Sequence, residues 1–378
     1  MNGQIRRMVL KIGSSSLNQL RGGLDVAAID KVVEVIAELR HQGIECVLVS
    51  SGAVAAGMGK LGLITRPKDV VGKQAVAAVG QGVLVEKYGQ ALSKHDLVGA
   101  QVLLSRTDLA EPGRYRNAQN TLERLLRLGI VPIINENDTV AIEELCFGDN
   151  DRLSALVAGL VHADLLVVLT DVDGLYSANP KNDPDATLIA EVKDVTEVRE
   201  AAGGAGSHVG TGGMITKLKA AEIATRFGIG MLLLNSARME EILQLTGGST
   251  GKKPYGTYFH PAKHRLSGRK RWIAYAGLSE GSIVVDEGAA GALIHEGKSL
   301  LAKGIVGIEG NWERKELVRI INQAGEQIAR GVAELSSDEL QLVQGRHSAE
   351  LMTLVPDLLS PEVVHRDNLT LMGEIGGK

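Results

Sequence analysis

The sequence predicts an α/β fold: a three-layer α/β/α sandwich with a mostly parallel sheet, followed by a small β-rich domain. Between Met8 and Phe259, short aliphatic strands alternate with helical patterns. This alternation is typical of a parallel sheet whose two faces are covered by helices. At about residue 260 the pattern changes to short strand-like pieces split by glycines, which predicts a second domain of different architecture.

The first domain is expected to span residues 1–259. Its strands are aliphatic runs bounded by turn residues. They are Met8–Ile12, Ile44–Val49, Leu97–Leu104, Val131–Ile134, Leu165–Leu169 and Gly230–Leu234. Its helices show apolar residues at a spacing of three to four, and the first has Asp25 at its N-cap and Gly43 as its stop. They are Val26–His41, Lys68–Ser93, Asn117–Leu128, Asp151–Val161, Met214–Phe227 and Met239–Leu245.

The second domain is expected to span residues 272–378, after a basic linker poor in helix at residues 260–271 with the sequence HPAKHRLSGRKR. Its expected helices are Asp286–His295 and Ser336–Leu342. Its expected strands are Trp272–Ala276, Gly281–Val285, Ser299–Ala302, Gly304–Ile308, Glu316–Ile321, Gln327–Val332 and Val363–His365.

Composition excludes several classes of protein. The 378 residues, 44% of them hydrophobic, can bury the cores of two domains, and with 3% aromatic residues those cores must be aliphatic. A net charge of −4 provides no overall basic field for nucleic acid. Cys46 and Cys146 are the only cysteines, which excludes a disulfide framework or a cysteine-rich zinc site. No stretch reads as a secretory signal or a membrane span, so we expect a cytoplasmic protein with no membrane partner.

Two small-residue turns, each with a lysine, predict a phosphate site. In Val9–Ser16 a strand carries Lys11 near its end and opens into Gly13 and three serines. In Gly203–Lys217 a loop with six glycines among its first eleven residues leads into a helix that carries Lys217. Glycines let backbone N–H groups converge on a ligand, and a helix N-terminus favours an anion. A flexible surface loop is the alternative for either turn alone, whereas both together predict a polyanion gripped from two sides.

Polar residues lie in three turns that follow expected strands and in a fourth that leads into an expected helix. They lie in Ser50–Val54, Asn135–Thr139, Phe147–Asp151 and Thr170–Gly174. Each turn alone is explained by ordinary capping chemistry. In a parallel sheet, however, the carboxyl ends of the strands meet at one edge, where ligands bind. We therefore expect these turns to form one site.

Two further glycine patterns are rejected. Gly57–Gly62 matches G-x-G-x-x-G but lies several residues past its strand and has no acidic residue about twenty positions later. Gly297-Lys298-Ser299 resembles the end of a phosphate-binding P-loop, but its upstream glycine is misplaced and no helix follows. The nine histidines show no metal-ligand spacing.

The motifs KIGSS, SSGAV, NENDTV, FGDND, TDVDGLY and GTGGMITK occur in this order. Together they resemble the glutamate 5-kinases of the amino-acid kinase family over about residues 5–260. The remainder resembles the PUA domain that follows the kinase in many bacterial members. The resemblance implies ATP-dependent phosphorylation of the γ-carboxylate of L-glutamate to L-glutamyl 5-phosphate, the first step of proline biosynthesis. It also implies Mg²⁺, feedback inhibition by proline, and a homo-oligomer, either a dimer or a tetramer.

The resemblance assigns roles to residues of this chain. Lys11, Lys217 and Asp151 would be catalytic, with Asp151 holding the lysines in place. Glutamate would be bound by Ser51, Asn135, Asp138 and Asn150, with Asp138 as the partner of the α-ammonium. ATP would be bound by Lys11, Gly13, Thr170, Asp171, Thr211, Gly212, Gly213, Met214, Ile215, Thr216 and Lys217. No residue is assigned to a metal, since no tight carboxylate cluster is present and Mg²⁺ can be carried by the phosphates.

Two alternatives remain open at this point. One is another amino-acid kinase, acting on aspartate, acetylglutamate or UMP. The other is an RNA-binding or RNA-modifying role for the PUA-like domain, assisted by basic residues in and around the linker. A solvated linker explains the same charges.

Overall fold

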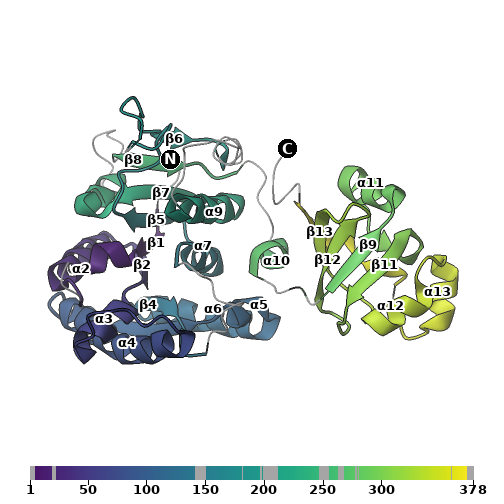
Figure 1. Ribbon diagram of the computed structural model, residues 1–378, viewed down its shortest axis with the longest axis horizontal. Helices are drawn as coiled ribbons and strands as arrows, with labels where there is room; N and C mark the ends of the chain where they lie inside the picture. Colours follow the sequence, from purple (N-terminus) through teal and green to yellow (C-terminus); the bar gives the residue numbers. More distant parts are fainter. Residues whose placement is uncertain are drawn as a thin grey trace. The chain divides into compact units, whose positions relative to one another are not determined.

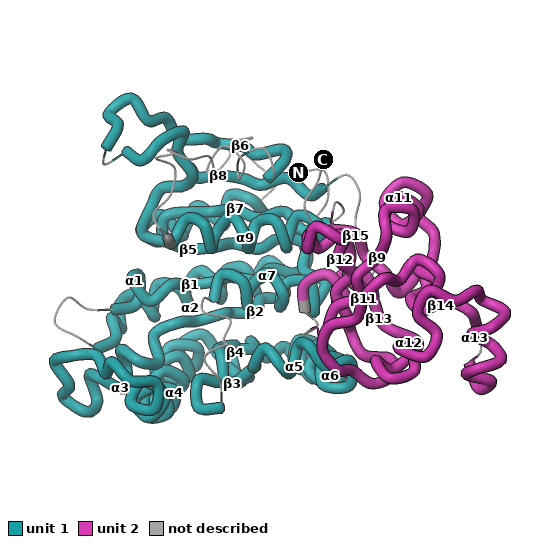
Figure 2. The backbone as a smooth tube through the Cα atoms, turned by 45° about the vertical axis from the view of Figure 1, so that its right-hand side comes forward, with its two compact units in different colours: residues 1–265 teal, residues 266–378 magenta. Residues whose placement is uncertain are grey.

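The computed structural model describes residues 5–18, 23–140, 150–180, 182–195, 198, 212–246, 255–262, 268–276, 279, 281–358 and 360–372. The chain divides into two compact units, residues 1–265 and residues 266–378 (Figure 2). Within the described ranges, every helix is too short or too polar to cross a membrane.

An eight-stranded sheet forms the centre of unit 1, in the order β3-β4-β2-β1-β5-β7-β8-β6. Neighbours from β3 to β7 are parallel, and β8 is antiparallel to β7. The predicted mostly parallel sheet is thus confirmed. The strands are β1 Arg7–Ile12, β2 Glu45–Ser50, β3 Gly99–Leu104, β4 Val131–Glu136, β5 Leu165–Thr170, β6 Glu191–Val192, β7 Gly230–Asn235 and β8 Gly256–Phe259.

Helices cover both faces of this sheet. Helix α2 (Val26–His41) lies on one side of β1 and β2, and α7 (Asn150–Leu160) and α9 (Gly212–Arg226) lie on the other (Figure 1). Asp25 caps α2 by accepting a hydrogen bond from the backbone N–H of Ala28, as the sequence predicted. Strands β4 and β5 are buried along their whole length, as expected for strands covered on both faces.

The remaining helices of unit 1 differ in part from the expected ones. They are α1 Ser14–Leu17, α3 Ala53–Leu61, α4 Val70–Ser93, α5 Arg106–Ala110, α6 Pro112–Arg127 and a 3₁₀ segment at Ser236–Leu245. Helix α3 was not among the expected helices, and only Ser50–Val54 was described as a turn; the small residues after Gly52 continue into a helix. Helix α6 begins five residues before the expected start because Pro112 occupies its first turn, where a missing N–H costs nothing.

Helices α3 and α4 pack so closely that two glycines are required between them. A Cβ on Gly57 would lie 1.9 Å from the backbone oxygen of Val76, and one on Gly80 would lie 1.7 Å from that of Ala53. Both distances are far below van der Waals contact. This packing holds the start of α3, and with it the turn after β2, against the rest of unit 1.

Unit 2 contains a five-stranded sheet in the order β11-β9-β12-β13-β15 and a two-stranded sheet, β10-β14. Its strands are β9 Gly281–Val285, β10 Leu300–Leu301, β11 Ile305–Gly310, β12 Leu317–Asn322, β13 Gln327–Val332, β14 Glu362–Val364 and β15 Leu369–Leu371. Its helices are α10 Gly268–Arg271, α11 Glu287–Glu296, α12 Ser337–Val343 and α13 Ser348–Leu354. The expected small β-rich domain is confirmed, although α13 and β15 were not expected.

The prediction of a strand at Trp272–Ala276 was wrong. These residues form a π-helical turn that continues α10. Residues 268–271 form α10 itself, where the sequence predicted a linker poor in helix. A short apolar run does not by itself distinguish a strand from a buried helical turn. Here the packing of Ile273 against Leu317 and Val332 decides in favour of the helical turn.

The close approach of α3 and α4 predicts opposite effects for two substitutions on one helix. Gly80→Ala should lower the free energy of unfolding by about 1–3 kcal/mol, because the added methyl group overlaps the backbone of α3. Gly82→Ala is the matched control: a Cβ there meets no atom within 4 Å, and alanine favours a helix interior by about 0.5–1 kcal/mol. Urea unfolding followed by circular dichroism measures both. Equal stability of the two variants would contradict this packing.

Candidate active site

The parallel register brings the polar turns together at one edge of the sheet. Ile12 at the end of β1 is level with Ser50 of β2 and Leu169 of β5. Val49 of β2 is in turn level with Ile134 of β4. The residues that follow these strands are therefore neighbours, as the sequence analysis expected.

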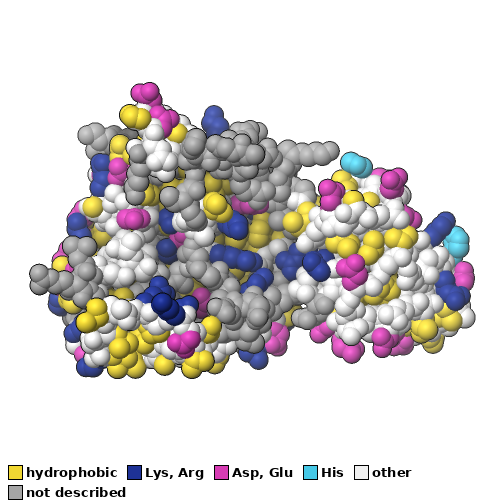
Figure 3. All heavy atoms as spheres, viewed as in Figure 1, with side chains coloured by type: hydrophobic (Ala, Val, Ile, Leu, Met, Phe, Trp, Pro, Cys, Tyr) yellow, Lys and Arg dark blue, Asp and Glu magenta, His cyan; other side chains and the backbone are white. Residues whose placement is uncertain are grey.

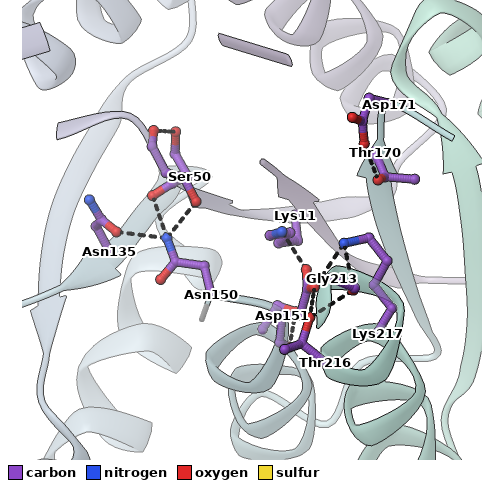
Figure 4. A network of polar contacts seen from close by, with 12 residues as sticks. Lys11, Ser50, Asn135, Asn150, Asp151, Thr170, Asp171, Gly213, Thr216 and Lys217 are labelled. Carbon is purple, nitrogen blue, oxygen red and sulfur yellow. Dashed lines mark hydrogen bonds and ion pairs between the residues drawn. The ribbon is translucent and has the colours of Figure 1, made fainter. Parts of the chain in front are cut away.

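Asp151 lies at the centre of this edge, in the first turn of α7, with its side chain 1% exposed. Its Oδ1 forms an ion pair with Lys11 Nζ from β1, and its Oδ2 lies 3.2 Å from Lys217 Nζ of α9. Thr216 Oγ1 donates a hydrogen bond of 3.1 Å to the same Oδ2 (Figure 4). One buried carboxylate thus joins a strand and two helices, and it holds both predicted lysines.

The cluster of Lys11, Lys217 and Asp151 has an excess of positive charge, which favours binding of an anion. Two ammonium groups share one carboxylate, so the described cluster carries a net positive charge in a poorly solvated place. The start of α7 adds its own positive potential beside Asp151. The side chains of Lys11 and Lys217 are only 5% and 14% exposed, so their positions are fixed by the protein rather than by solvent. Such an arrangement is suited to a polyphosphate.

A cavity of about 330 Å³ lies beside this cluster. All four predicted substrate-binding residues, Ser51, Asn135, Asp138 and Asn150, line it. The Nδ2 of Asn150 donates to Ser51 Oγ at 2.8 Å and to Asn135 Oδ1 at 3.0 Å (Figure 4). Asn150 directly precedes Asp151, so the cavity and the lysine cluster are neighbours at the start of α7.

The two adjacent serines after β2 have different surroundings. Ser50 is fully buried, and its Oγ lies 2.9 Å from the hydroxyl of Tyr88. Ser51 lines the cavity, and its Oγ accepts the hydrogen bond from Asn150. Of the two serines, Ser51 is therefore the one that lines the cavity, and its role toward a substrate stays a prediction.

Asp138 is a desolvated carboxylate in the cavity wall. Burial raises its pKa above the usual value, and this effect outweighs a hydrogen bond from Gln81 and the positive charge of Arg66, which both lower it. A half-buried anion with these neighbours is suited to a cationic group of a ligand.

Thr170 and Asp171, which were predicted to bind a nucleotide, lie on the side of Lys11 away from Asn135 and Asn150 (Figure 4). Thr170 Oγ1 donates to Asp171 Oδ1 at 3.1 Å, just after β5. Gly13 lies next to Lys11: a Cβ on this residue would be 3.6 Å from Lys11 Nζ. Gly212 begins α9, followed in its first turn by Gly213, Met214 and Ile215. Thr211 and the rest of the glycine-rich loop lie outside the described residues.

Comparison with known proteins adds to this geometry. The model of the amino acid kinase family matches residues 6–235, and that of the PUA domain matches residues 281–355.

The chain belongs to the amino acid kinase family.

Three bacterial relatives are named glutamate 5-kinase. The protein of Desulfitobacterium hafniense is 69% identical, over 98% of this chain and 99% of the relative. The protein of Trichlorobacter lovleyi is 50% identical and that of Moorella thermoacetica 46%, each over 98% of this chain and 97% of the relative. The similarity therefore extends through both units of this amino acid kinase.

Arg66 and Gln81 were not among the predicted site residues. Arg66 lines the cavity from the turn between α3 and α4, and Gln81 of α4 reaches Asp138. Neither residue belongs to a motif or follows a strand. The only signal for Arg66 is Pro67, which marks an ordered turn without revealing what that turn faces.

The shared carboxylate predicts a large difference between two chemically identical substitutions. Asp151→Asn should lower the free energy of unfolding by about 3–5 kcal/mol, because two poorly solvated ammonium groups lose their counter-charge. Asp30→Asn, the control, breaks a 2.7 Å surface pair with Lys94, which is worth at most about 1 kcal/mol. Urea unfolding of both variants tests this, and similar losses would show that Asp151 does not hold a buried charge cluster.

Proposed function

We propose that this protein is an ATP-dependent kinase that phosphorylates the γ-carboxylate of L-glutamate, forming L-glutamyl 5-phosphate and ADP. The observation that carries the proposal is the adjacency of two sites: a cavity lined by the desolvated carboxylate of Asp138, and the lysine pair held by Asp151. The first is suited to the ammonium group of an amino acid, the second to a phosphoryl group in transfer. The names of the relatives support glutamate as the acceptor.

The proposed reaction requires little beyond positioning of the two substrates and neutralisation of their negative charges. A carboxylic acid with a pKa of about 4.3 is ionised at neutral pH, so the acceptor needs no general base. One oxygen of the γ-carboxylate forms a bond to the γ-phosphorus of ATP, and the bond from that phosphorus to the β–γ bridging oxygen breaks with its electrons, releasing ADP. Two anions must approach each other for this step. Lys11 and Lys217 are placed to neutralise the charge of the transferred group.

Each remaining residue of the site has a role in this proposal. Ser51, Asn135 and Asn150 form a hydrogen-bonded set that would orient the acceptor. Thr170, Asp171, Gly13 and the start of α9 would line the nucleotide site, together with Thr211. Asp151 would be a positioning residue, since both of its oxygens are already engaged by the lysines and Thr216.

Mg²⁺ fits this site as an ion carried by the nucleotide. The described residues include no group of three or more His, Cys, Asp or Glu side chains that could hold a metal ion. The carboxylate of Asp151 is used by two lysines. When bound to the phosphates, Mg²⁺ supplies further charge neutralisation.

Several finer assignments belong to the same proposal and rest on the resemblance to glutamate 5-kinases. They are a place at the first step of proline biosynthesis, feedback inhibition by proline, a dimeric or tetrameric state, and a cytoplasmic location. The division into a kinase domain at 1–259, a linker at 260–271 and a PUA-like domain at 272–378 is proposed with them.

Weak RNA binding by the PUA-like domain stays a prediction. Acidic residues outnumber basic ones in residues 266–378. On the face drawn in Figure 3, side chains of both charges are interspersed over unit 2. Binding to phosphates would therefore be weak and strongly dependent on salt.

ADP formation with a panel of acceptors tests the proposed function. We expect turnover with L-glutamate, and far slower turnover with aspartate, N-acetylglutamate or UMP. Trapping with hydroxylamine should convert the acyl phosphate product to a hydroxamate. Turnover with another acceptor and none with glutamate would overturn the proposal in favour of a different amino-acid kinase.

Asp138→Asn should separate stability from binding. The pKa of Asp138 is higher in the folded protein than in the unfolded chain. Stability therefore falls as pH rises from the unfolded-state pKa toward the folded-state pKa, and this loss of stability is present at pH 7. The neutral amide should therefore stabilise the ligand-free protein, while KM for glutamate rises about 10- to 100-fold through loss of a charge-assisted hydrogen bond. KM for ATP should barely change. Thermal unfolding and steady-state kinetics measure both effects, and an equal rise in both KM values would contradict the assignment.

A further inference from the structure

Arg66 is the single lysine or arginine among the described residues that line the acceptor cavity. It lies in the turn between α3 and α4 and lines the same cavity as Asp138, whose carboxylate is close enough for the charge of Arg66 to lower its pKa. Among the described residues its guanidinium forms no hydrogen bond and no ion pair within 4.0 Å. This differs from Lys11 and Lys217, whose charges are both engaged by Asp151.

The turn that carries Arg66 is held in place from its C-terminal side. Pro67 follows directly, and a residue before proline is confined to extended backbone conformations. Two residues further on, Asp69 caps α4 by accepting a hydrogen bond of 2.6 Å from the backbone N–H of Gly72. The close packing of α3 against α4 at Gly57 and Gly80 fixes both ends of the connection. The backbone position of Arg66 at the cavity is therefore set by the fold, while its side chain is exposed and available to a ligand.

An α-amino acid presents a cation and an anion on one carbon. Asp138 supplies an anion for the ammonium group, and an uncommitted guanidinium nearby supplies two parallel N–H donors, the geometry that matches a carboxylate. Resting on the proposed function, we infer that Arg66 binds the α-carboxylate of the acceptor amino acid and so selects amino acids over amines that carry the same terminal carboxylate.

In this assignment, separate groups of the protein bind the two ends of the substrate. Arg66 and Asp138 in the cavity wall bind the α-carbon end, which carries the carboxylate and the ammonium. The γ-carboxylate is left for Ser51 and Asn150, beside the start of α7 and the lysine cluster. Removal of Arg66 should therefore weaken acceptor binding without disturbing the phosphoryl-transfer site.

Two analogues of glutamate isolate the predicted contact. 4-Aminobutyrate lacks the α-carboxylate but keeps the ammonium, and glutarate lacks the ammonium but keeps both carboxylates. In Arg66→Gln, kcat/KM for glutamate should fall about 10- to 100-fold, kcat should stay within about twofold, and the inhibition constant of 4-aminobutyrate against glutamate should stay unchanged. The inhibition constant of glutarate should rise. The comparison is made at pH 7 and at pH 8, and the same result at both pH values shows that loss of a nearby cation does not act through protonation of Asp138.

Two further variants complete the test. Lys68→Gln removes a positive charge from the same turn at an exposed residue that does not line the cavity, and it should leave all three constants near wild type. Arg66→Lys keeps the charge but loses the paired donors, and its kcat/KM should fall between those of wild type and Arg66→Gln.

Equal weakening of glutamate and 4-aminobutyrate by Arg66→Gln would overturn the inference, because it would place the effect on a part common to both molecules. So would unchanged kinetics with glutamate. If the wild-type enzyme forms no ADP with glutamate, the proposed function and this inference fall together. A wild-type enzyme that uses glutamate separates the two.

Discussion

The interaction on which the site depends is the buried carboxylate of Asp151 shared by two lysines. Lys11 comes from β1, Asp151 from α7 and Lys217 from α9, so a single charge group ties the centre of the sheet to two of the helices that cover it. A like-charged pair of ammonium groups could not be held so close without it. The arrangement keeps both cations in place and still leaves a net positive charge for a ligand.

The rest of unit 1 serves to bring this group to the cavity. Parallel pairing of β1 with β2 and β5 aligns the strand ends, and the fully buried aliphatic strands make that alignment rigid. The glycine contacts between α3 and α4 hold together the two helices that flank the turn of Arg66, which lines the same cavity as Asn150 and Asp138. Acceptor selection and phosphoryl transfer are thereby assigned to adjoining but separate groups of side chains.

Most of the sheet and much of the site could be predicted from the sequence, because each strand is a long aliphatic run and each polar turn follows one. The sequence pattern gave a wrong prediction, or none, where packing determines the local structure. Trp272–Ala276 has the composition of a strand but forms a helical turn that packs within unit 2. Arg66 has no pattern at all, since its importance comes from the cavity that its turn faces. The phosphate cradle expected at Gly203–Thr211 lies outside the described residues and stays a prediction.

The most direct test of the central claim is the kcat of Lys217→Met and Lys11→Met in ATP-dependent phosphorylation of glutamate. Loss of one positioned donor to the transferred group should lower kcat by roughly 10²- to 10³-fold, with little change in KM for glutamate. Lys219 is an exposed lysine two residues after Lys217 on α9, and Lys219→Met should retain wild-type kcat. A kcat near wild type in either Lys217→Met or Lys11→Met would contradict the account, because that lysine would then balance Asp151 without acting on the phosphoryl group.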